Sequence, residues 1–99
     1  MKPYKDYDKH LLKSLKDPVE AAAYLNAALE ESDPAIFLMA YYNVARAHGI
    51  KKISDQAKIH RVSLNKMLSK RGNPEWKSLL RVLSASKLRF RVEAVLRAA

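Results

Sequence analysis

Apolar residues recur along most of this chain at the three- and four-residue spacing of amphipathic helices. In the first half, this spacing predicts helices over residues 7–16, 18–31 and 34–48. Asp17-Pro18 and Asp33-Pro34 mark the starts of the second and third, because aspartate caps free N–H groups and proline fits the first helical position. The apolar residues that define them are Tyr7, Leu11, Leu12 and Leu15 in the first, Val19, Ala22, Leu25 and Leu29 in the second, and Ile36, Phe37, Leu38, Met39, Ala40, Tyr41, Val44 and Ala47 in the third, the expected core helix.

Residues 50–69 predict two short helices, over 50–57 and 61–69, joined at the turn Lys58-Ile59-His60 in a helix-turn-helix. The inward set is Ile50, Ile53, Ser54, Ala57, Ile59, Leu64 and Leu68. The second helix keeps Arg61, Val62, Asn65, Lys66 and Ser69 facing outward. A cation, a methyl-bearing side chain and an amide on one exposed helix face are the groups that read base edges in a major groove. The alternative is an ordinary solvated pair of helices.

The pattern changes near the C-terminal end. Asn73-Pro74 opens a supporting helix over residues 74–85, whose core face consists of Trp76, Leu79, Leu80 and Leu83. Leu88, Phe90 and Val92 then alternate with charged residues, which predicts a strand over 88–92. A lone strand needs a partner: a second copy, another protein or an N-terminal segment. The alternatives are a frayed tail or an extension of the helix to Ala99.

The positive charge is confined to the second half of the chain. Residues 1–49 hold six Lys/Arg against seven Asp/Glu, and residues 50–99 hold thirteen against three, which together give the net charge of +9. Nucleic-acid phosphate is the commonest partner for such a surface. A membrane surface is the rival, but it requires a longer amphipathic helix than this region offers. The expected phosphate contacts are Lys51, Lys52, Lys58, Ser69, Lys70 and Arg71, whereas the partners of Lys77, Arg81, Arg89 and Arg91 stay open.

The residue inventory argues against catalysis and against a bound cofactor. The chain has no cysteine, its three histidines fall on separate predicted elements, and its two glycines cannot form a Gly-rich phosphate loop. No metal site is expected. Its longest uncharged stretch, residues 34–45, is too short to span a bilayer, and its charged N-terminus is no secretory signal. We therefore expect a cytoplasmic, non-enzymatic protein forming a single domain over residues 1–99.

Three segments of the chain are the most specific: AAAYLNAALEE (21–31), VARAHG (44–49) and MLSKRGNP (67–74). With their surroundings, over about residues 12–92, they resemble the probable addiction-module antidote proteins, which are helix-turn-helix antitoxins of bacterial type II toxin–antitoxin modules. The resemblance implies a mainly α fold of five to six helices, comprising a lambda-repressor-like (XRE-type) domain, an N-terminal helical extension and the short C-terminal strand. It also implies an antitoxin that neutralises a RelE/ParE-like toxin and, as a homodimer, represses its own operon at operator DNA.

Residue by residue, Arg61, Ser63, Leu64 and Lys66 match the family's recognition helix, and Leu64 and Leu68 match its core positions. The chain departs from the family at four positions: Ser54 replaces alanine, Lys58 and Lys87 replace glycine, and Asn65 replaces tyrosine. A left-handed backbone at Lys58 costs roughly 1 kcal/mol or more. Asn65 is suited to bidentate recognition of adenine.

Two functions remain open from sequence: the antitoxin, and a stand-alone helix-turn-helix regulator without a toxin. Leu88, Phe90 and Val92 are the candidate contacts to a toxin or a second copy.

Overall fold

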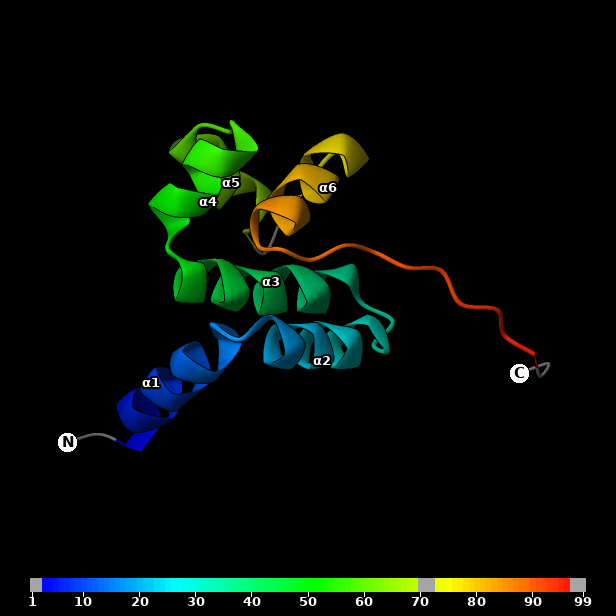
Figure 1. Ribbon diagram of the computed structural model, residues 1–99, viewed down its shortest axis with the longest axis horizontal. Helices are drawn as coiled ribbons and strands as arrows, with labels where there is room; N and C mark the ends of the chain where they lie inside the picture. Colours follow the sequence, from blue (N-terminus) through cyan, green and yellow to red (C-terminus); the bar gives the residue numbers. More distant parts are fainter. Residues whose placement is uncertain (1–2, 70–72, 97–99) are drawn as a thin grey trace.

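The computed structural model describes residues 3–69 and 73–96, in which it contains six helices and no strand (Figure 1). They are α1 (Pro3–Leu15), α2 (Pro18–Leu29), α3 (Pro34–His48), α4 (Ile50–Ala57), α5 (Arg61–Met67) and α6 (Trp76–Ala85). The mainly α class is thus confirmed. α1 begins four residues earlier than predicted, α5 ends at Met67 instead of Ser69, and α6 starts at Trp76 instead of Pro74.

The predicted starts of α2 and α3 are confirmed by their capping bonds. The Asp17 carboxylate accepts a hydrogen bond from the Val19 backbone N–H at 2.9 Å, and Asp33 accepts one from Ala35 at 3.0 Å. Both caps satisfy donors that the first helical turn leaves free. Gly49 ends α3 with φ +102°, where a side chain would be strained, so α4 can leave in a new direction.

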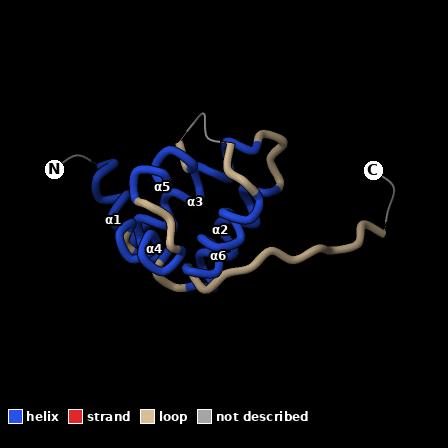
Figure 2. Tube along the Cα trace, turned by 90° about the horizontal axis from the view of Figure 1, so that it is seen from above, coloured by secondary structure: helices blue, strands red, loops and turns tan. Residues whose placement is uncertain are grey.

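The core helix is α3, as predicted. In Figure 1 it lies between α1 and α2 on one side and α4, α5 and α6 on the other, and the view from above shows α3 enclosed among the other helices (Figure 2). Tyr41 is fully buried, donates a hydrogen bond to the Val82 carbonyl at 2.8 Å and shares a second with the Ser86 hydroxyl. Burial raises the pKa of Tyr41 to about 12, although the bond to Ser86 lowers it. This contact fixes α3 against α6.

Several predicted core residues lie at the surface. In α2, Val19 and Leu29 are 75% and 50% exposed, and the buried positions are Ala21, Leu25 and Ala28. These alanines allow the close contact of α2 with α3. Further predicted core residues are exposed in the other helices, namely Tyr7, Met39, Trp76 and Leu80, whereas Val82 of α6 is fully buried.

The predicted strand over residues 88–92 is not formed. Lys87 adopts φ +62°, and the N–H groups of Lys87 and Leu88 bond to the Ser84 and Leu83 carbonyls, which closes the C-terminus of α6. Leu88 and Phe90 then pack against the core, with the Phe90 ring 5.2 Å from that of Trp76 and 5.7 Å from that of Phe37. Residues 91–96 are exposed and project away from the helices (Figure 1). The apolar and charged residues do alternate, but the described residues contain no strand with which this segment could pair.

Within the described residues, no helix is both long and apolar enough to cross a membrane.

Candidate nucleic-acid interface

The turn between α4 and α5 is closed by its own backbone and by Ser54. Lys58 adopts the left-handed conformation (φ 57°, ψ 44°), and the Ile59 N–H bonds back to the Ser54 carbonyl at 3.1 Å. Of the two possibilities for this departure from glycine, a remodelled turn or a strained left-handed lysine, the structure has the left-handed lysine. The hydroxyl of the buried Ser54 donates to the Ile59 carbonyl at 2.5 Å, a bond that an alanine at this position could not form. Side chain and backbone of Ser54 together fix the angle at which α5 leaves the turn.

Arg81 of α6 also holds this turn. Its Nε and Nη2 donate to the Ala57 carbonyl at 2.9 and 2.7 Å, and Nη2 donates to the Lys58 carbonyl at 2.8 Å. The last carbonyls of a helix have no partner within it and carry the negative end of its dipole, so a guanidinium there is favourable. The sequence alone did not indicate which partner Arg81 binds. In the structure it is a positioning residue for the α4–α5 pair.

The predicted outward face of α5 is exposed. Leu64 and Leu68 are 0% and 4% exposed and anchor the helix, whereas Val62 on the opposite side is 66% exposed. Arg61, Asn65 and Lys66 are exposed as well.

Both ends of α5 are capped by side chains. Nδ1 of His60 accepts a hydrogen bond from the Val62 N–H at 3.2 Å, a role not predicted from sequence, although His60 stands directly before the helix. The hydroxyl of Ser69, which lies beyond the end of α5, donates to the Lys66 carbonyl at 2.7 Å. Ser69 was predicted to contact phosphate; its side chain is exposed, but its hydroxyl is used locally.

Three of the four candidate base-reading residues each border a different recess of the surface. Arg61 lies beside Lys51 and Lys58 at a recess of about 420 Å³ between α4 and the turn. Asn65 borders a recess of about 730 Å³, on the side of α5 that faces α3. Lys66 borders a third, of about 640 Å³, that extends to the residues before α6. The structure thus groups Arg61 with Lys51 and Lys58 and places Asn65 at a different recess.

The remaining cationic side chains differ in their exposure and in whether they already form an ion pair. Lys51 forms an exposed ion pair with Asp55 at 2.8 Å, one turn along α4, and such pairs contribute only about 0.3–0.5 kcal/mol. Partial burial lowers the pKa of His48, and the charges of Lys52 and Lys87 lower it further. The side chains of Lys52 and Lys58 are exposed. Lys70 and Arg71 lie outside the described residues.

No group of three or more His, Cys, Asp or Glu side chains that could hold a metal ion occurs in the described part of the chain. The features above define a small all-helical protein whose most distinctive surface is a basic, side-chain-clamped pair of short helices. A family model described as "Probable addiction module antidote protein" matches residues 5–94, and the chain therefore belongs to this family. It is also similar to an uncharacterized protein of Haemophilus influenzae, with 35% identity over 89 residues that cover 90% of each chain. No solved structure matches the chain.

Proposed function

We propose that this protein is an antitoxin that binds and neutralises a RelE/ParE-like toxin and represses its own operon by binding operator DNA. The family match supports the antidote role, because a family of addiction-module antidotes implies a toxin partner. It also favours a regulatory, non-enzymatic protein that acts in the cytoplasm. The identity of the toxin class comes from the resemblance of the sequence.

The observation that carries the operator-binding half of the proposal is the outward face of α5. Arg61, Asn65 and Lys66 are exposed on a helix that Leu64 anchors from behind, as in the second helix of a lambda-repressor-like helix-turn-helix. Arg61 and Lys66 are cations, Asn65 supplies an amide, and the exposed Val62 is suited to contact with a thymine methyl group.

The surroundings of α5 favour DNA over an uncharged partner. Lys51 of α4 and Lys58 of the turn border the same recess as Arg61 of α5, where they would meet phosphates without specifying bases. Lys52 is an exposed cation on the same helix as Lys51. The ion pair of Lys51 with Asp55 is weak and exposed, so a phosphate can displace the carboxylate. Ser54 and Arg81 hold the turn rigid, which fixes the register of α5 in a groove.

Co-expression with the adjacent reading frame tests the toxin half of the proposal. We expect a stable complex that is larger than either protein alone, and we expect growth to be inhibited by the neighbouring protein only when this chain is absent. Growth inhibition that this chain does not relieve would contradict the antitoxin role. If no partner copurifies but operator binding persists, the stand-alone regulator is the correct function.

A gel shift on the promoter of the same operon tests the DNA half. Arg61→Ala should weaken binding by roughly 5- to 150-fold, the equivalent of 1–3 kcal/mol for a base contact. Lys16→Ala is the matched control, because Lys16 is exposed, carries the same charge and lies between α1 and α2. Equal effects of the two substitutions would show that α5 is not the recognition element.

A further inference from the structure

The C-terminal segment, residues 88–96, carries large apolar side chains into solvent. Val92, Val95 and Leu96 are 96%, 84% and 95% exposed. Within the described residues, the backbone of residues 89–96 forms no hydrogen bond. An extended segment with free backbone groups and exposed apolar side chains is a template for strand pairing.

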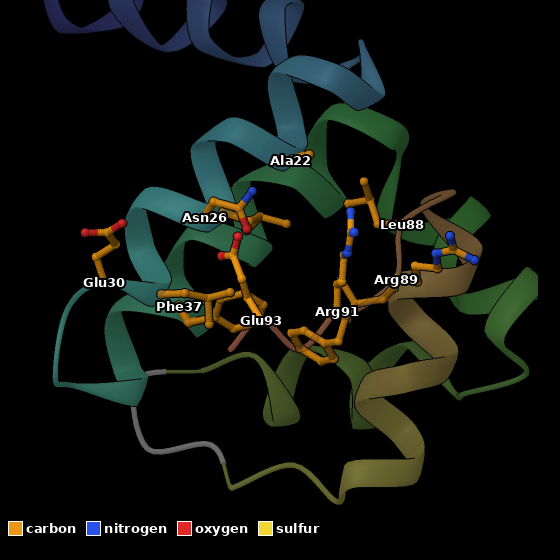
Figure 3. Close-up of a pocket in the computed structure, with 12 residues that line it drawn as sticks. Ala22, Asn26, Glu30, Phe37, Leu88, Arg89, Arg91 and Glu93 are labelled. Atoms are coloured by element: carbon orange, nitrogen blue, oxygen red, sulfur yellow. The ribbon is translucent and has the colours of Figure 1, made fainter. Parts of the chain in front are cut away.

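A groove runs along this segment on the side of α2. Its volume is about 660 Å³, and its apolar lining is Ala22, Leu25, Leu29, Phe37, Leu83, Leu88 and Phe90. Figure 3 shows the groove, with Ala22, Asn26 and Glu30 contributed by α2 and Leu88, Arg91 and Glu93 by the C-terminal segment. It therefore lies where a second strand beside the segment would place its side chains.

We propose that the occupant is the same segment of a second copy, paired antiparallel about a two-fold axis at Val92. This proposal deepens the homodimer implied for an operator-binding antitoxin and rests on that proposed function. Its first support is the periodicity of the segment. Every second residue is apolar (Leu88, Phe90, Val92, Ala94 and Leu96), so the paired strands present one continuous apolar face.

Charge selects the register. With Val92 opposite itself, Arg91 faces Glu93 of the partner, and by symmetry Glu93 faces the partner's Arg91, which gives two opposite-charge pairs. If the two-fold axis passed through Arg91 or Glu93, that residue would lie opposite the same residue of the partner strand. If it passed through Phe90, Arg89 of one strand would lie opposite Arg91 of the other. If the pairing of the two strands shifts by one residue, the apolar face of one strand lies beside the charged face of the other. Among registers centred on residues 90–93, only the one centred on Val92 avoids both faults.

The same register fills the groove. Opposite Leu88 and Phe90, which pack against the core, stand Leu96 and Ala94 of the partner. In this pairing they would extend the apolar face of Leu88 and Phe90 into the groove, which Leu29 of α2 borders. Half of Leu29 is exposed in the single chain, although the sequence predicts it to be inside. Dimerisation therefore covers an apolar surface that α2 leaves uncovered.

Sizing by light scattering in the absence of DNA tests the pairing. The wild-type protein should have twice the 11.3 kDa mass of one chain. Arg91→Glu and Glu93→Arg should each shift the population toward monomer, because each places like charges opposite one another, and the double variant should restore the dimer. Arg89→Glu is the matched control, because Arg89 faces Val95 of the partner. A monomeric wild type, or a dimer that neither single variant weakens, would overturn the proposal.

Disulfide crosslinking tests the register in a chain that has no native cysteine. Val92→Cys should crosslink two copies, because residues directly opposite in an antiparallel pair have Cα atoms about 4.5–5.5 Å apart, within disulfide range. Val95→Cys is the control, since two copies of residue 95 would lie about 20 Å apart. Crosslinking of Val95→Cys as readily as Val92→Cys would overturn the register.

A gel shift of the same variants keeps this inference separate from the proposed function. If the pairing is wrong but operator binding is real, the single charge variants leave operator affinity unchanged. If operator binding is wrong, the dimer and its crosslink persist without any preference for promoter DNA.

Discussion

Replacement of Arg81 by methionine should destabilise the protein through the turn that presents α5. Methionine keeps the stem of the side chain but removes three hydrogen bonds of 2.7–2.9 Å to the carbonyls of Ala57 and Lys58. A hydrogen bond to a charged group contributes about 1.5–3 kcal/mol. The guanidinium is partly exposed and water can replace it, so we expect a total loss of about 1–2 kcal/mol. For a chain of this size, that loss lowers Tm by roughly 5–15 °C.

Thermal unfolding monitored by circular dichroism measures this loss, with two reference variants. Arg81→Lys should recover only part of it, because an ammonium group cannot reproduce the fork of the guanidinium. Lys77→Met, one turn earlier on α6, removes an exposed charge that makes no hydrogen bond in the described part of the chain and should leave Tm nearly unchanged.

DNA binding distinguishes this positioning role from a phosphate contact by Arg81. A side chain that only positions α5 can change the affinity but leaves the salt dependence of binding unchanged. If Arg81→Met instead keeps the wild-type Tm and lowers the slope of log K against log salt by about 0.9, the side chain neutralises a phosphate and our interpretation is wrong.

Three further substitutions test the remaining features. Lys58→Gly should raise the free energy of unfolding by about 0.5–1 kcal/mol, because relief of the left-handed strain exceeds the entropy that glycine adds to the unfolded chain; urea denaturation showing a loss of stability would contradict this. Tyr41→Phe should lower the free energy of unfolding by about 1 kcal/mol in the same assay, because the buried hydrogen bond to the Val82 carbonyl is lost. An unchanged denaturation midpoint would show that this bond does not stabilise the protein. His48→Gln should reduce acid sensitivity. Because the folded state lowers the pKa of His48, the unfolded chain binds the proton more tightly, and stability falls as the pH drops through about 6.5; parallel Tm–pH curves for the variant and wild type would refute that account.

Local signals in the sequence were sufficient where the cause is local. The caps Asp17 and Asp33 predicted the starts of α2 and α3, and Gly49 predicted the boundary between α3 and α4. The inward set of the helix pair, including the fully buried Ile53 and Leu64, followed from helical spacing around a short turn. Each of these features is set by residues within a few positions of one another.

Features that depend on tertiary contacts were not predicted. α2 is rich in alanine on several sides, so periodicity alone cannot choose its buried face, and contact with α3 selects Ala21 and Ala28 instead of Val19 and Leu29. The clamp between Arg81 and Ala57 joins residues 24 positions apart. Trp76 finds its contact on Phe90 outside the core. The alternation from Leu88 to Val92 gave the correct inward residues for Leu88 and Phe90, but a strand requires a neighbouring strand, and the part of the chain that the structure describes contains none.

The account rests on α5 reading base edges with its exposed face, and Asn65 offers the most direct test. Binding of the wild-type protein and Asn65→Ala should be measured by fluorescence anisotropy on promoter DNA, on single-base-pair variants of it and on a scrambled duplex. We predict that Asn65→Ala relaxes the preference at one base pair by about 1–3 kcal/mol and leaves affinity for the scrambled duplex nearly unchanged. A uniform loss on every duplex, or a wild-type protein that binds promoter and scrambled DNA equally, would contradict it.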